Sequence, residues 1–183
     1  MKTKDIINSI YYYYPQNIGL EDIEEYTNSK EYKNRLKACL DARMNNVDWT
    51  NFKVELNEYV STKYGDELND YSILGNTPCY SATFGFGKFG NNNSFALSVL
   101  ISIVVPLWSY RIIDFSIPNT SRFKPQNDHE KQSIQFLQGL IAKTFSNYNF
   151  IDEEQHQIVV PDISTAYKSS PTIFEAVFKE DLN

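Results

Sequence analysis

The sequence predicts an α+β fold in which N-terminal helices and one later helix pack on a mainly antiparallel sheet. The first 65 residues repeat apolar side chains at helical spacing, whereas β-branched and aromatic residues dominate between residues 71 and 115. Between Tyr71 and Tyr110 the only charged side chain is Lys88, so this stretch must be mostly covered by other parts of the chain. A length of 183 residues fits one domain over 1–183, divided into a helical part (1–70), a sheet part (71–118) and a helix with a mixed tail (119–183).

Three helices are expected in the first 65 residues. The first runs from Thr3, a possible N-cap, to Tyr14, because Pro15 disfavours the helical conformation of the residue before it. The second begins after Ser29, and its apolar stripe is Tyr32, Leu36, Cys39, Leu40 and Arg43 or Met44. The polar side of this second helix carries Lys33, Arg35, Lys37 and Asp41.

The third and fourth helices have the clearest patterns. Asp48 is the expected N-cap of the third, and Gly65 is expected to end it in a left-handed conformation. Its apolar stripe is Trp49, Phe52, Leu56, Tyr59, Val60 and Tyr64. The fourth covers residues 128–147 and is capped by Asn127 or Asp128. Its stripe is Ile134, Leu137, Ile141, Phe145 and Tyr148, widened by Phe136 and Leu140.

Strands are expected at residues 71–74, 80–86, 95–105 and 107–115. The connections between them are too short for a crossover helix, so consecutive strands should pair antiparallel. Residues 118–126 form a polar loop, and residues 158–160 are a further strand candidate. Residues 172–178 could be a helix or a strand. Ser170 as N-cap and Pro171 at the first helical position favour the helix.

Charge and hydropathy exclude several classes of partner. A net charge of −6 and a pI near 4.9 disfavour nucleic-acid binding. The longest apolar run, residues 95–108, contains Pro106 and is shorter than the roughly 20 residues of a membrane-spanning helix, so no membrane association is expected. No secretory signal pattern begins the sequence, and two cysteines make no disulfide framework. These observations favour a cytoplasmic protein.

Few residues suggest catalysis. The segment Gly85-Phe-Gly-Lys-Phe-Gly90 has dinucleotide-motif spacing but leads into a strand rather than a helix, which favours a hairpin turn. The only histidines, His129 and His156, match no metal motif, and Cys39 lies on an apolar stripe. We therefore expect no enzyme, no metal site and no cofactor. The alternative is a small hydrolase or nucleotide-using enzyme with a site near Gly85–Gly90 or His156.

Acidic clusters and tyrosines are the candidate partner-binding residues. Such surfaces attract a basic protein and hold it through aromatic anchors. Four consecutive tyrosines cover most of a helix circumference, so at least one of Tyr11 to Tyr14 should lie outside the core. A further acidic cluster, Asp66, Glu67 and Asp70, has the same composition. The predicted partner-binding residues are Tyr12, Tyr13, Glu21, Asp22, Glu24, Glu25, Asp152, Glu153 and Glu154.

Three segments resemble small immunity proteins of bacterial polymorphic and contact-dependent toxin systems. They are Tyr12-Tyr-Tyr-Pro15, Glu25-Tyr26 with Ser29-x-Glu31-Tyr32, and Thr172-Ile-Phe-Glu-Ala-Val-Phe178. The resemblance covers about the first 35 and the last 20 residues and carries over no binding residue by position. It implies a cytoplasmic, non-enzymatic protein that binds a cognate toxin domain and occludes its active site. A third possibility is a subunit or adaptor that assembles through the apolar sheet.

Overall fold

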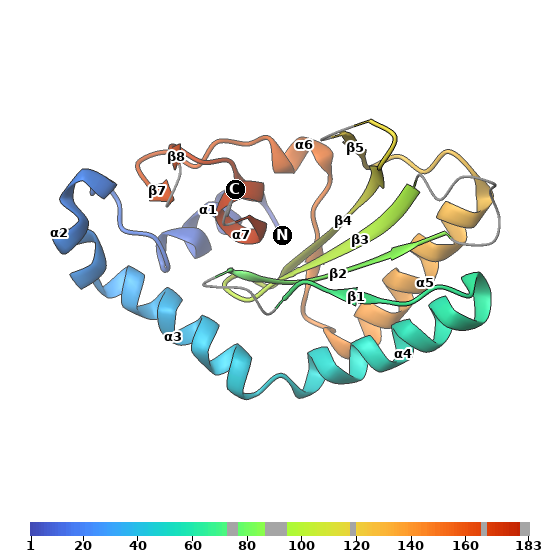
Figure 1. Cartoon of the computed structure of the whole chain (residues 1–183). Coiled ribbons are helices and arrows are strands. Elements are labelled where there is room, and N and C mark those ends of the chain that lie inside the picture. The colour runs from blue at the N-terminus through green and yellow to red at the C-terminus, as the bar shows by residue number, and fades with distance from the viewer. Residues whose placement is uncertain (73–76, 87–94, 118–119, 166–167, 180–183) are drawn as a thin grey trace.

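The computed structural model describes residues 1–72, 77–86, 95–117, 120–165 and 168–179. It confirms the α+β class and the mainly antiparallel sheet (Figure 1). The helical elements are α1 (Thr3–Tyr11), the 3₁₀ turn η1 (Leu20–Asp22), α2 (Ile23–Asn28), α3 (Lys30–Met44), α4 (Val47–Tyr64), α5 (Asp128–Thr144), α6 (Glu153–His156) and α7 (Ile173–Phe178). The strands are β1 (Asn69–Asp70), β2 (Cys79–Gly85), β3 (Phe95–Ser102), β4 (Leu107–Asp114), β5 (Thr120–Arg122), β6 (Asn149–Phe150), β7 (Ser164–Thr165) and β8 (Lys168–Ser169).

The main sheet has the strand order β1-β2-β3-β4-β5. Strands β2, β3 and β4 pair antiparallel, so that Phe84, Leu97 and Ile112 form one row across the sheet. After α5 the chain returns beside the start of β4, where β6 pairs with it in parallel and opposes Asn149 to Leu107. This parallel pair was not predicted. Strands β7 and β8 form a separate two-stranded sheet.

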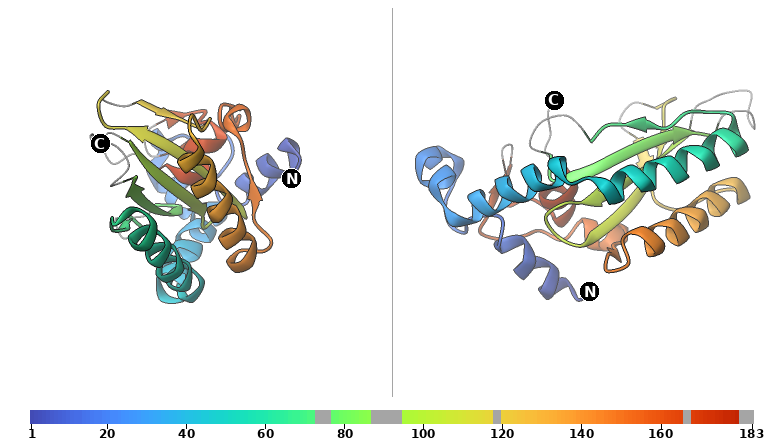
Figure 2. Two further views of the ribbon diagram at one scale, coloured as in Figure 1. Left: turned by 90° about the vertical axis from the view of Figure 1, so that its right-hand side faces the viewer. Right: turned by 90° about the horizontal axis from the view of Figure 1, so that it is seen from below.

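Helices α4 and α5 cover one face of the main sheet (Figure 2). The predicted α4 stripe is buried apart from Tyr59, which is half-buried, and α5 adds Ile134, Leu137 and Ile141. At the start of α5, buried Glu130 accepts two hydrogen bonds, of 2.7 and 2.8 Å, from the guanidinium of Arg122 on β5. This ion pair joins the edge strand to the first turn of the helix.

The opposite face of the sheet is covered by α1, α7 and the C-terminal tail. Leu100 and Leu107 point from the sheet into this second core, which Ile6 and Ile10 enter from α1. Tyrosine hydroxyls join the N-terminal helices to tail carbonyls. The Tyr14 hydroxyl donates to Ala176 O at 2.6 Å, the Tyr26 hydroxyl to Ser164 O at 2.8 Å and the Tyr11 hydroxyl to Pro161 O at 3.3 Å.

Several predicted helix boundaries were wrong by a few residues. Helix α1 ends at Tyr11 rather than Tyr14, because the N–H groups of Tyr13 and Tyr14 both turn back to Ile10 O. Thr3 is the first residue of α1, and Lys2 holds the cap position. Helix α4 begins at Val47 after Asn46, two residues before the expected cap at Asp48. Gly65 ends α4 with φ 62°, as predicted. The fourth helix is capped by Asn127 and ends at Thr144, before the expected residue 147.

The loops and the tail also differ from the expectation. Tyr71 and Ser72 follow β1 and are not in a strand, and the rest of the predicted strand at 71–74 lies outside the described residues. The third strand ends at Ser102 instead of residue 105, and β5 lies within the predicted polar loop. Residues 158–160 contribute only a single bridge, from Val159 to Thr172. Residues 173–178 are helical, and the N-cap is Thr172 rather than Ser170 because Thr172 and Glu175 form a capping box.

The prediction that Arg35 lies on the polar face of α3 was wrong. Its side chain is buried, and the guanidinium lies 4.9 Å from the centroid of the Tyr14 ring and 5.3 Å from that of Tyr32. Leu40 and Met44, predicted to be on the apolar stripe, are instead exposed. Helix α3 therefore docks on the ring of Tyr14 through Arg35, with Tyr32 of the same helix beside the guanidinium. Among the described residues, no helix has the length and apolar composition needed to cross a membrane.

We predict that Tyr14→Phe lowers the free energy of unfolding by about 1–3 kcal/mol, because the Ala176 carbonyl then loses a buried donor. The matched control is Tyr12→Phe, since Tyr12 is 56% exposed; it should change the free energy by less than about 0.5 kcal/mol. Urea unfolding followed by circular dichroism measures both. Equal effects of the two substitutions would contradict the prediction.

Candidate functional site

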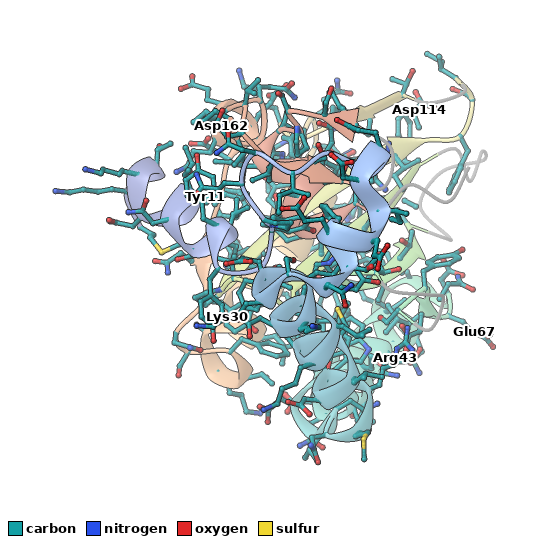
Figure 3. The ribbon with its side chains drawn as sticks, turned by 90° about the vertical axis from the view of Figure 1, so that its left-hand side faces the viewer. Tyr11, Lys30, Arg43, Glu67, Asp114 and Asp162 are labelled. Carbon is teal, nitrogen blue, oxygen red and sulfur yellow. The ribbon has the colours of Figure 1, made fainter. Side chains whose placement is uncertain are left out.

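The predicted acidic residues of η1 and α2 form one exposed surface, which we call the α2 acidic surface: Glu21, Asp22, Glu24 and Glu25. They surround Ile23, which is 56% exposed, and line a shallow depression of about 520 Å³. Helix α2 lies at one end of the molecule, the end that faces the viewer in Figure 3. None of these four carboxylates forms an ion pair with a residue that the structure describes.

The predicted tyrosines lie at the end of α1. Tyr12 is exposed and Tyr13 half-buried, and their rings meet edge to face with centroids 4.9 Å apart. Burial raises the pKa of Tyr13, and the neighbouring Tyr12 and Cys39 raise it further. The backbone of Tyr12 accepts a hydrogen bond from Asn34 of α3. The pair is therefore fixed to the same helix that follows α2.

The acidic residues of α6 lie elsewhere. Asp152 is the N-cap of α6 and accepts a hydrogen bond from Gln155 N at 2.9 Å, so part of its role is structural. Glu153 and Glu154 are exposed in the first turn. Helix α6 lies toward β5, away from α2 (Figure 1), so the structure does not bring the two predicted acidic groups together.

The remaining acidic cluster is used by the fold. Asp70 pairs with Lys53 at 2.6 Å, and although burial raises its pKa, hydrogen bonds from Lys53 and Ser72 lower it below the ordinary value. Asp66 accepts a hydrogen bond from Gly85 N at 2.8 Å. The first N–H of the Gly85–Gly90 segment thus already bonds a carboxylate. Residues 87–90 of that segment lie outside the described residues.

His156 is enclosed rather than presented to a cleft. The rings of Phe123 and Phe174 lie 4.7 and 4.8 Å from its centroid, and neither ring nitrogen bonds to a described residue. Burial lowers the pKa of His156 to about 4; Asp152 opposes this and Arg111 adds to it. The imidazole is therefore neutral at pH 7. His129 is exposed at the start of α5.

A groove that the sequence did not reveal lies at the bend between α3 and α4. It has a volume of about 530 Å³ and opens between this bend, β2 and the segment after α5. Two carboxylates, Asp41 and Asp48, line it together with Tyr80 and Tyr148, and the described residues that line it include no lysine or arginine. We call it the bend groove. Within the described residues, no group of three or more His, Cys, Asp and Glu side chains could hold a metal ion.

Helix ends and tyrosines shape the bend groove. Tyr80 projects from β2 and stacks on Trp49 with centroids 4.9 Å apart, while its hydroxyl donates to Ala42 O at 2.7 Å. Burial raises the pKa of Tyr80 to about 12, with smaller contributions from Tyr148 and Asp48. Burial likewise raises the pKa of Tyr148, and Tyr13 and Asp48 add to the shift. Both phenols therefore remain protonated at neutral pH beside the carboxylate.

Sequence signals for this groove were present only in part. The predicted second helix ended near Met44 and the predicted third helix began near Asp48, but no bend between them was predicted. The sequence gives no register for Tyr148, which reaches the bend only because α5 runs beside α4 and ends close to the start of that helix. Bringing these side chains together depends on tertiary packing.

We predict that the free energy of unfolding decreases as the pH falls from 6.5 toward 4. In this interval the unfolded chain protonates His156 whereas the folded chain does not, because the folded pKa is about 4 and the ordinary value 6.5. The slope should reach at most about 1.4 kcal/mol per pH unit. Urea unfolding between pH 6.5 and 5 largely isolates this effect, since Glu130 and Glu175, whose pKa values are lowered by hydrogen bonds, stay ionised in the folded chain, and carboxylates of the unfolded chain take up protons mainly below pH 5.

His156→Leu should remove this dependence without lowering stability at pH 7, because the imidazole makes no hydrogen bond to a described residue. The control His129→Gln alters an exposed histidine and should leave the slope unchanged. A slope that persists in His156→Leu would assign the titration to another group.

Comparisons with known proteins provide no relative for these surfaces. No protein-family model, no curated protein and no solved structure matches the chain. The α2 acidic surface and the bend groove are therefore interpreted from their own charge, exposure and geometry.

Proposed function

We propose that the chain is a non-enzymatic binding protein that associates with a basic partner protein and occludes its functional surface. The observation that carries the proposal is the α2 acidic surface, four exposed carboxylates around an exposed isoleucine. The resemblance to small immunity proteins supports the same function. On that basis the partner is a cognate toxin domain and the compartment is the cytoplasm.

The α2 acidic surface has the composition of an interface that is reached by electrostatic attraction. Carboxylates that form no ion pair with a described residue leave a local negative potential, which raises the association rate of a positively charged partner. Ile23 at its centre offers an apolar contact from which water can be excluded, and such contacts slow dissociation. Charge would therefore speed the encounter, and the apolar centre would prolong the complex.

Two alternatives have less support. An enzyme site at Gly85 would need free backbone N–H groups to bind a phosphate, but the Gly85 N–H already donates to Asp66. A site at His156 would need solvent access, but His156 is buried. Assembly through the sheet would need an open apolar face, whereas helices cover both faces in the described residues. Neither an enzyme site nor assembly through the sheet is therefore favoured over binding through the α2 acidic surface.

Co-expression with the product of the directly upstream coding region tests the proposal. We expect a one-to-one complex by size-exclusion chromatography with light scattering, and loss of that product's toxicity to growing cells. No complex, together with thermal stabilisation of the chain by a nucleotide or a divalent metal ion, would overturn the proposal in favour of an enzyme.

We predict that Glu24→Lys with Glu25→Lys slows association with that partner about ten-fold at low salt and flattens its salt dependence. The control, Glu58→Lys with Glu67→Lys, changes the net charge equally at exposed positions on and after α4. It should alter the rate by less than about two-fold. Stopped-flow mixing at several salt concentrations measures both, after thermal melting confirms that each variant folds. Equal slowing by the two pairs would remove α2 from the interface.

A further inference from the structure

We infer that the bend groove is a receptor for an arginine side chain of the basic partner. This inference rests on the proposed function and names a second contact within it. The groove differs from the α2 acidic surface because it combines carboxylates with aromatic rings in one concave site. That combination suits a planar cation better than a general basic surface.

The first step concerns charge. Asp41 and Asp48 are both exposed, and the groove lining contains no basic side chain that would neutralise them. Residues that follow the last turns of α3 and α5, Asn45 and Phe145, also line the groove, so two helix C-termini border it. Each C-terminus carries about half a negative charge, but Arg43 and Lys143 in the last turns of α3 and α5 and the N-terminus of α4 offset these partial charges, so the negative charge of the groove comes from Asp41 and Asp48. The groove should therefore carry a negative potential and attract a cation.

The second step concerns shape. Tyr80 is held between its stacking contact with Trp49 and its hydrogen bond to Ala42 O, so its ring is a rigid wall. Tyr148 lines the same groove, with its ring centroid 5.2 Å from that of Phe145. A guanidinium stacks on aromatic rings and donates two parallel hydrogen bonds to a carboxylate, whereas an ammonium is a compact point charge. Aromatic walls beside carboxylates therefore favour arginine over lysine.

The third step concerns the remaining donors of the guanidinium. Arginine has five N–H donors in a fixed planar arrangement. Two carboxylates cannot accept all five at once, so the remaining donors need other acceptors. Asn46, Thr144 and Asn147 add neutral side-chain oxygens to the lining. The same groups disfavour other ligands: carboxylates repel a phosphate, and the polar lining gives a purely apolar ligand little to bury. A volume of about 530 Å³ leaves room for the arginine stem.

Helix α3 relates the groove to the α2 acidic surface. It begins next to α2 and ends at the groove, and Lys30 and Arg43 mark its two ends in Figure 3. Its 15 residues span about 22 Å. A standard interface of about 800 Å² per partner is wide enough to reach across such a distance. One basic partner could therefore be attracted at α2 and anchored at the bend.

Small arginine probes test the inference with the full-length chain alone. N-acetyl-L-arginine methylamide should bind in an NMR titration, with the largest shifts at Asp48 and Tyr148. The lysine analogue should bind at least several-fold more weakly, and the uncharged norleucine analogue should not bind. Asp41→Asn with Asp48→Asn should weaken arginine binding at least ten-fold, whereas the control Glu58→Gln with Glu67→Gln should not change it.

A second variant separates shape from charge. Tyr148→Leu keeps both carboxylates, so it should reduce the preference for arginine over lysine while retaining weak binding of both. Thermal melting confirms that each variant folds. Equal binding of the three probes, shifts confined to α2, or unchanged affinity in Asp41→Asn with Asp48→Asn would overturn the inference.

The two proposals can fail separately. If the α2 charge-reversal variant associates slowly but no arginine probe binds in the bend groove, the binding function is supported and the arginine site is wrong. If arginine probes bind in the bend groove but no one-to-one complex with the partner forms, the arginine site is supported and the proposed function is wrong.

Discussion

The central constraint on this fold is that β3 is buried on both faces. Leu97, Val99 and Ile101 point to the core under α4 and α5, while Leu100 points to the core under α1 and α7. A strand with two apolar faces needs a covering layer on each side, because exposed apolar surface favours aggregation. The chain supplies the two layers from different regions. Helices α4 and α5 form one, and both ends of the described chain combine to form the other.

The bend groove follows from this division into layers. Helix α3 is tied to the second core, because Arg35 lies over the ring of Tyr14, which belongs to that core. Helix α4, only two residues after α3, belongs to the first core through Trp49 and Phe52. The chain therefore passes from one layer to the other at Asn45 and Asn46, where it cannot remain helical. The groove lies where the layers meet, so its position is set by packing and not by a motif.

Local patterns predicted the longer helices α3, α4 and α5 and the long strands well because one stripe of side chains decides them, whereas the short helices α2 and α6 were not predicted. The stripe from Trp49 to Tyr64 and the capping residue Asn127 are examples. Features that depend on distant segments were missed. The burial of Arg35 needs Tyr14 from another segment, β6 needs the register of β4, and the groove needs Tyr148 beside Asp48. The acidic residues of α2 were recognised as a group because they are adjacent in sequence. Their separation from α6 was set by tertiary structure.

The tyrosine hydroxyls that join α1 and α2 to the tail have a consequence for biosynthesis. The hydroxyls of Tyr11, Tyr14 and Tyr26 donate to the carbonyls of Pro161, Ala176 and Ser164, which are translated 150, 162 and 138 residues later. Until then the apolar side of α1 and the outer face of β3 have no cover. Such late, long-range contacts slow folding and prolong exposure of a nascent chain. Translation through α7 therefore completes the second core, and nascent chains that stop before it would be the ones that chaperones must protect.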